Sequence, residues 1–174
     1  MQPEQAKFLL NFFLPQLKSE QATTTRILRA IPRDKAAYAP HPKCWSALRL
    51  AIHIAATEIW FLDAVLDLNF RDDDVPSPEW TTPANVARWY DANFAQRLPR
   101  LEALSPQHLA TPVNFIGLRN EPAVSYLGFA IRHSVHHRGY LAAYLRPMGA
   151  EIPAIYVESA DEPSPPSPAA IPVI

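Results

Sequence analysis

The sequence predicts an all-α protein, a bundle of four long helices followed by a proline-rich C-terminal tail. Apolar residues recur at the spacing of an amphipathic helix in four separate segments, and capping or helix-breaking residues flank those segments. Glycine is scarce, with 4 residues, whereas the 19 prolines stand mostly between the segments and in the tail. The 174 residues allow one domain with a real core. We therefore expect the bundle over residues 1–158 and an extended tail over residues 159–174.

The first helix is expected over residues 4–29, ahead of a loop rich in proline over residues 32–43. Its apolar stripe consists of Phe8, Phe12, Leu17 and Ile27. Pro15 lies inside this segment and predicts either a kink or a later start of the helix.

The second helix is expected over residues 45–68, with Ser46 as its N-cap. Its apolar face consists of Leu48, Ile52, Ala55, Ile59, Leu62 and Leu66. The aspartates and prolines over residues 72–78 then predict a solvated loop.

The third helix is expected to begin after Thr82, which can cap it, and Pro83 suits its first turn. Its buried stripe consists of Val86, Trp89, Tyr90, Phe94, Leu98, Leu101 and Leu104. Pro99 predicts a bend near the end of this helix. Residues 108–121 are too few for a pair of helices and mildly strand-like, so we expect an extended crossover or a hairpin there.

Histidines gather in the last helix, which is expected over residues 122–148 with Gly149 at its C-terminal cap. His133 and His137 are four residues apart, so they lie on one face of the helix, about 40° apart around its axis. Two imidazoles so placed can bind one metal ion at roughly 2.0–2.1 Å. His136 lies about 60° from His133 and about 100° from His137, which makes it the weaker candidate ligand.

A third ligand has to come from another helix, and His53 in the second helix is the best candidate. Its neighbours are apolar and small, so the imidazole is expected to be buried and to need a polar partner. A hydrogen-bonded core histidine is the alternative. For the pair on the last helix the alternative is a solvated face, because Arg132 and Arg138 flank the two histidines.

Charge and cysteine usage restrict the class of protein. The formal net charge is -1 and no basic run stands out, so nucleic acid is not an expected partner. Cys44 is the single cysteine, which excludes an intramolecular disulfide and fits a reducing, cytoplasmic compartment. The start of the chain lacks the basic region of a signal peptide, and the apolar residues 8–14 are too few to span a membrane.

The segment 133–139, HSVHHRG, resembles the HxxxHRG signature of the DinB/YfiT-like family of metal-binding proteins. The similarity continues at intervals through residues 141–156. His53, in its Ala-Ile-His-Ile-Ala context, is similar to the histidine in the family's second helix. The resemblance covers residues 1 to about 162.

This resemblance implies an up-up-down-down four-helix bundle with a three-histidine site for zinc or nickel on His53, His133 and His137. Characterised relatives include S-transferases that use the low-molecular-weight thiols bacillithiol or mycothiol, a mycothiol-dependent isomerase, and proposed metal-dependent hydrolases. Homodimers are common among them. Two residues depart from the family pattern: Ser134 stands where some relatives have the glutamate of HExxH, and Tyr140 stands where glutamine is frequent.

Further candidates to surround such a site or to bind a substrate are His136, Tyr140, Tyr126 and Arg132. The two tyrosines line either the metal face or the core. Arg132 and Arg138 are expected either to hold an anionic thiol or to be solvated or at the rim of a dimer. Glu58 is expected in a surface or interhelical ion pair. Asp63 is expected in solvent, with orientation of another helix or binding of a substrate as the alternatives. Cys44 is expected to be a buried, inert thiol.

Three imidazole ligands leave at least one coordination position open, which is the pattern of catalytic rather than structural zinc. Such a metal can acidify a bound water or bind and ionise a thiol. The first hypothesis is thus a metal-dependent thiol S-transferase or hydrolase that acts on a small molecule. The alternative is a non-catalytic metal-binding or interaction module. A homodimer is expected from the number of large aromatic residues, which include Trp60, Phe61, Trp89 and Phe94.

Overall fold

Four long helices make up the bundle in the computed structural model, which describes residues 1–71 and 80–162. The elements in chain order are α1 (Pro3–Arg29), a 3-10 turn (Arg33–Lys35), α2 (Ala47–Asp67), α3 (Pro83–Glu102), α4 (Pro106–Ala110), β1 (Pro112–Phe115), β2 (Arg119–Pro122) and α5 (Ser125–Leu145). The loop expected over residues 72–78 and the tail from residue 163 onward lie outside the described residues. None of the described helices carries an apolar run of membrane-spanning length.

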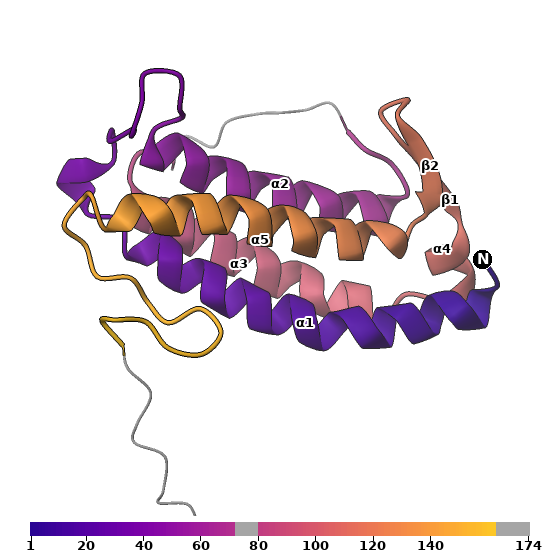
Figure 1. The fold of residues 1–174 in the computed structure, drawn as a ribbon. Coiled ribbons are helices and arrows are strands. Elements are labelled where there is room, and N and C mark those ends of the chain that lie inside the picture. Colours follow the sequence, from indigo (N-terminus) through magenta and orange to yellow (C-terminus); the bar gives the residue numbers. More distant parts are fainter. Residues whose placement is uncertain (72–79, 163–174) are drawn as a thin grey trace, which may run out of the picture.

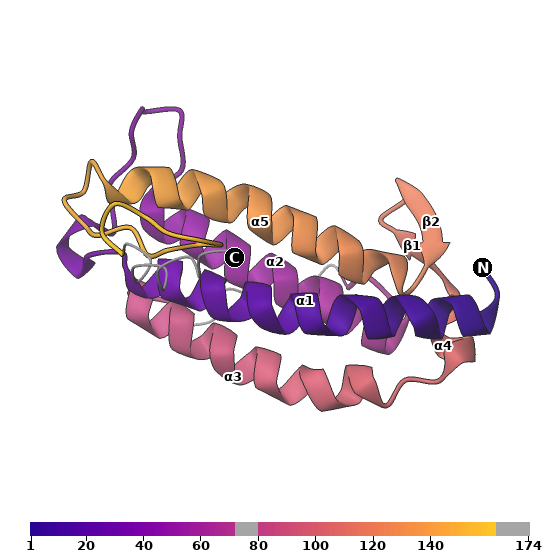
Figure 2. The ribbon, with the colours of Figure 1, turned by 60° about the horizontal axis from the view of Figure 1, so that its bottom comes forward.

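The long helices run up, down, down and up in chain order (Figures 1 and 2). α1 and α5 are parallel, because Thr24 late in α1 accepts a hydrogen bond from Arg138 late in α5. α2 and α3 are parallel as well, because Asp63 late in α2 pairs with Arg97 late in α3. The predicted helical bundle is therefore confirmed, but the expected order up-up-down-down is wrong. Residues 30–46 begin and end at the same end of the bundle, so α2 returns antiparallel to α1 (Figure 1).

Helix starts follow the capping residues of the sequence. The Ser46 side chain accepts a hydrogen bond from the backbone N–H of Arg49, and the Thr82 side chain accepts one from Asn85. Both predicted N-caps are confirmed, and a cap of this kind stabilises a helix by about 1 kcal/mol. α1 begins at its expected start and continues through Pro15. A late start of this helix is therefore excluded.

The segment after α3 forms the hairpin that was one of its two expected structures. β1 and β2 pair antiparallel with Val113 opposite Glu121, and the hairpin lies at the end of the bundle where α1 begins (Figure 1). The helix α4 precedes the hairpin, with Ser105 as its N-cap. At the other end, Gly149 has a φ of 76°, and the N–H of Ala150 bonds back to the carbonyl of Leu145. This closes α5 with the expected glycine.

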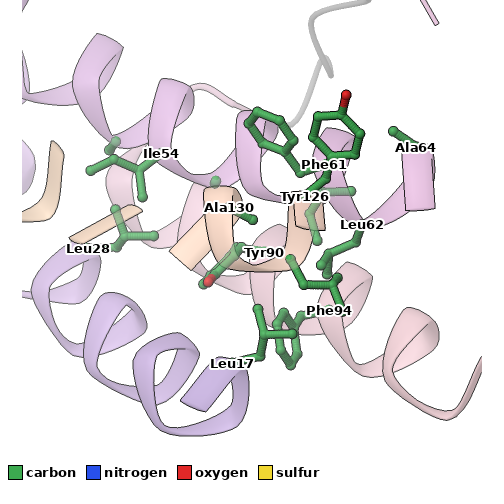
Figure 3. Close-up of a cluster of buried hydrophobic side chains, with 14 of the residues drawn as sticks. Leu17, Leu28, Ile54, Phe61, Leu62, Ala64, Tyr90, Phe94, Tyr126 and Ala130 are labelled. Carbon is green, nitrogen blue, oxygen red and sulfur yellow. The ribbon is translucent and has the colours of Figure 1, made fainter. Parts of the chain in front are cut away.

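The core lies between all four long helices (Figure 3). Its fully buried side chains include Leu17, Leu28, Ile54, Phe61, Leu62, Tyr90, Leu127 and Ala130. The stripe expected for α1 is only half right, because Phe8 and Phe12 are 70% and 57% exposed. Both lie about 200° around the helix from the buried Leu10, so they face away from the core. Two large aromatic side chains are thus left on the surface of α1.

Candidate metal centre

Three histidines from two antiparallel helices converge in one cluster. His53 lies in the second turn of α2, and His133 and His137 lie on consecutive turns of α5. The Nε2 atom of His53 is 3.2 Å from the Nε2 atom of His133 and 3.2 Å from that of His137. All three side chains are half-buried, and each offers a ring nitrogen within 4.8 Å of the other two. The cluster could hold one metal ion.

The spacing of the nitrogens fits a shared cation better than hydrogen bonds. Around a tetrahedral ion with metal–nitrogen distances of about 2.0–2.1 Å, neighbouring nitrogens stand roughly 3.3 Å apart. A neutral imidazole nitrogen carries either one proton or one lone pair, so the Nε2 atom of His53 cannot form a hydrogen bond with both neighbours. One cation satisfies three converging lone pairs at once. The donor set also suits the metal, because imidazole is a common ligand of zinc and nickel.

Burial keeps the imidazoles of His133 and His137 neutral. The pKa of His133 is lowered to about 4, first by burial and then by repulsion from the neighbouring histidines. The pKa of His137 is also lowered to about 4, again first by burial and then by the charges of His53 and His136. Metal ligands have to be deprotonated. At neutral pH both rings on α5 therefore offer a lone pair without first losing a proton.

The rings are held in different ways on the side away from the cluster. The Nδ1 atom of His53 lies 3.3 Å from the Thr57 hydroxyl, one turn further along α2. The Nδ1 atom of His133 is buried and has no hydrogen-bond partner among the described residues. Its ring instead packs against Phe61, with the ring centroids 6.1 Å apart. Hydrogen bonding orients the first ring and packing orients the second.

An aromatic side chain that sequence reasoning missed covers the cluster. The Trp45 ring meets His53 edge to face with centroids 4.9 Å apart, and it lies nearly parallel to His137 at 6.4 Å. Trp45 remains 37% exposed, and the guanidinium of Arg49 stands 4.7 Å over its ring. The signal was present in the sequence, because positions 45, 49 and 53 follow one another at intervals of four.

Of the four other residues that the sequence suggested around the site, three are exposed and one is buried in the core. His136 is exposed, and its ring contacts His137 at 4.9 Å and Tyr140 at 5.0 Å. Tyr140 is exposed beside the cluster. Arg132 is also exposed, with its guanidinium 5.9 Å from the Phe129 ring. The fourth candidate, Tyr126, is buried and donates a hydrogen bond of 2.8 Å to a carbonyl of the hairpin, so it packs the core and does not line the metal face.

Glu58 was expected in a surface or interhelical ion pair, but it is wholly buried in the bundle and its hydrogen-bond partner is a neutral residue of α5. The Ser134 hydroxyl donates a hydrogen bond to its carboxylate. Burial raises the pKa of Glu58 to about 7, and the hydrogen bond from Ser134 and the charge of Arg138 work in the opposite direction. Since Ser134 lies about 100° around α5 from His133, position 134 faces the core. The missing HExxH glutamate therefore concerns a position that does not face the cluster.

Arg138 is also buried, at 1% exposure, which contradicts the expected roles in solvent or in binding an anionic thiol. Its guanidinium pairs with Glu20 at 2.5 Å and donates to the hydroxyls of Thr24 and Tyr156. A buried charge is tolerated only with such partners. Asp63 is likewise not free in solvent but forms two hydrogen bonds of 2.7 Å with one guanidinium of α3.

Cys44 differs from expectation as well, because its side chain is exposed rather than buried. It directly precedes Trp45 in the loop before α2. Its thiol does not belong to the histidine cluster, which consists of His53, His133 and His137.

Three histidines on an antiparallel helix pair, inside a four-helix bundle, could hold a metal between the helices, as in the class of helix bundles with a metal site in the core. The chain belongs to the DinB family, whose family model matches residues 6–168. The Bacillus subtilis protein YrdA, itself uncharacterised, is 27% identical over 157 residues, which make up 88% of this chain and 91% of YrdA.

Two solved structures share the fold. One is a DinB-like protein from Bacillus subtilis, YjoA, with a TM-score of 0.69 and 24% identity over 84% of this chain and 96% of that one. The other is a DinB-like protein from Bacillus cereus, with a TM-score of 0.69 and 25% identity over 83% of this chain and 95% of that one. These similarities cover nearly the whole bundle.

Proposed function

We propose that this protein binds one divalent transition metal, zinc or nickel, through His53, His133 and His137, and uses it in catalysis. The convergence of three imidazole rings is the observation that supports this proposal, with the Nε2 atom of His53 3.2 Å from those of His133 and His137. Three protein ligands with a remaining open position are typical of catalytic metal sites, whereas structural sites have four. The reaction we propose is a thiol S-transfer or a hydrolysis that acts on a small molecule.

A bound metal would supply Lewis acidity, which lowers the pKa of a coordinated water or thiol. The protein's own residues orient and shield the reactants. The ring of Trp45 covers two of the imidazoles and keeps bulk water from that side of the cluster. His136 and Tyr140 form an exposed aromatic pair next to His137, where part of a substrate can stack.

One observation favours a second candidate, a metal-binding module without catalysis. Ser134 is engaged with Glu58 in the core, so no carboxylate at this position can serve as a general base. A thiol that ionises on the metal needs no such base, whereas hydrolysis of an amide gains much from one. The lack of a general base at this position therefore favours the binding module over a hydrolase but not over an S-transferase. The S-transferase remains the preferred reaction, with a low-molecular-weight thiol as the second substrate.

The two candidates differ in turnover. Metal-loaded protein is screened with small thiols against electrophiles, and with ester and amide substrates, beside the His137→Ala variant and a His136→Ala control. The enzyme proposal expects turnover that is lost in His137→Ala, whereas His136→Ala keeps kcat and raises only KM, because it removes a stacking surface and no metal ligand. Metal-loaded protein without turnover on any of these substrates would favour the binding module.

The proposal extends to assembly and location. A homodimer is proposed, although Phe61 and Phe94 are buried within one bundle, so these two residues do not motivate it. The exposed Phe8 and Phe12 on α1 supply a better reason. A cytoplasmic location is proposed because a single cysteine is typical of reducing compartments.

A further inference from the structure

A stacked cation stands beside the histidine cluster. Trp45, Arg49 and His53 follow one another at intervals of four, which places Arg49 one helical turn from the ligand on the same face of α2. The guanidinium of Arg49 lies 4.7 Å over the Trp45 ring, and this ring contacts His53 at 4.9 Å. The indole thus connects the cation to the cluster.

The charge of Arg49 is not used within the described part of the fold. No carboxylate among residues 1–71 and 80–162 forms an ion pair with it, and its side chain is exposed. By contrast, Arg97 and Arg138 in the same bundle are paired with acidic residues. A guanidinium stacked on an aromatic ring keeps its N–H donors directed outward in one plane. That arrangement is suited to receive a carboxylate through two parallel hydrogen bonds.

A second arginine next to the cluster, on α5, is not stacked on a ring that contacts the histidines. Arg132 directly precedes His133, but its guanidinium stands over Phe129. One of its nitrogens lies 3.5 Å from where a side chain at Gly128 would begin, one turn back along α5. Its charge is therefore directed towards the start of α5, away from His137, and it serves as a natural comparison for Arg49.

We propose that Arg49, held on Trp45, binds the carboxylate of a small anionic thiol whose sulfur occupies the open position of the metal. This inference rests on the proposed function and specifies its substrate. An imidazole that binds a metal carries no charge, so three of them leave the charge of a divalent ion uncompensated and an anionic sulfur is favoured there. A carboxylate on the same molecule then meets the guanidinium of Arg49, which is stacked on the ring that contacts His53. Stacking on the indole fixes where that carboxylate lies.

The test compares charged and neutral thiols on cobalt-loaded protein. The probes are mercaptocarboxylates of increasing chain length, each paired with its neutral amide, and binding is followed by the thiolate-to-cobalt absorption band. We expect the best carboxylate to bind about tenfold more tightly than its amide, which is the order expected of a charge-assisted hydrogen bond at an exposed site. Arg49→Gln removes this preference, and Arg49→Lys restores part of it. Arg132→Gln, which changes the net charge by the same amount, keeps it.

Each outcome has a distinct meaning. Protein that takes up no cobalt contradicts both the proposed function and this inference. Protein that binds cobalt but shows equal affinity for every carboxylate and its amide contradicts only the role of Arg49. The same holds if Arg132→Gln removes the preference while Arg49→Gln keeps it. Cobalt content is measured on every variant, so that a misfolded protein is recognised by the loss of the metal.

Discussion

On α5, each histidine of the cluster is followed by a residue anchored in the core. His133 precedes Ser134, which bonds to Glu58, and His137 precedes Arg138, which pairs with Glu20. One position along a helix is a rotation of about 100°, so the histidines face the cluster while their successors face the interior. The anchors fix the rotation of α5 about its own axis. They also fix the direction in which both imidazoles point.

The buried carboxyl of Glu58 makes the stability of the protein depend on pH. Its pKa is about 7 in the folded protein, whereas the ordinary value, which applies to the unfolded chain, is 4.5. Between these two values the folded state therefore binds more protons than the unfolded state. The stability that Glu58 contributes is therefore full below 4.5 and is lost as pH rises through about 7. We expect Glu58→Gln to be more stable than the wild type at pH 8, by up to about 3 kcal/mol, with little difference at pH 5.

The measurement is urea unfolding of both proteins at the two pH values. His133 and His137 contribute in the opposite sense, because a pKa lowered from 6.5 to about 4 withdraws stability as pH falls through this range. Both proteins share this contribution, so the difference between them isolates Glu58. A difference that is the same at pH 5 and pH 8 would show that this carboxyl does not titrate as inferred.

At the scale of elements, the site depends on how closely α5 packs against its neighbours. α5 contacts α2 along the cluster and α1 on its other side. Gly128 permits the approach to α1, because a side chain there would begin 2.8 Å from the Phe13 ring. Gly139 in the same helix has open space, with nothing within 4 Å. The two glycines are thus a matched pair, one required by packing and one not.

Alanine at these positions should change stability in opposite directions. Gly128→Ala forces the Phe13 ring or α1 to move, and we expect a loss of about 1–3 kcal/mol. Gly139→Ala removes the backbone freedom of a glycine within a helix, and we expect a gain of roughly 0.5–1 kcal/mol. Chemical denaturation measures both. Equal effects of the two substitutions would mean that α1 and α5 leave room for a side chain at Gly128, contrary to the structure.

At the scale of the whole molecule, periodicity and capping residues were enough to predict four helices and both caps, Ser46 and Thr82. Helix spacing paired His133 with His137, but helix directions did not follow from the sequence. A link of the length of residues 30–46 can join parallel or antiparallel helices equally well, so only the packing decides. The exposure of Phe8 was not predicted either. Aromatic residues along one face of a helix do not indicate whether that face packs against the other helices or faces solvent.

The polar core was beyond prediction for a different reason. Glu58 and Arg138 are tolerated inside because their partners come from distant parts of the chain, such as Glu20 and Tyr156. A single residue with its neighbours in sequence carries no sign of such partners. Trp45 was missed for a different reason, because its spacing from His53 was a signal that could have revealed it.

The surface of α1 carries the prediction for assembly. Phe8 and Phe12 expose large apolar area on one helix face, and burying it between two copies of the chain would stabilise a dimer. Light scattering should give a mass of two chains for the wild type and of one chain for the Phe8→Ser, Phe12→Ser double variant. Leu118→Ser, at an equally exposed apolar residue of the hairpin, should remain dimeric. A wild type with the mass of one chain excludes the dimer.

The three-histidine centre is tested most directly by elemental analysis of the purified protein after loading with zinc or nickel and removal of excess metal. The wild type and His136→Ala should retain one ion per chain at pH 7. His53→Ala, His133→Ala and His137→Ala should each lose it, because two imidazoles hold an ion far more weakly than three. A wild type that retains no metal, or a His137→Ala variant that retains as much as the wild type, would contradict the centre.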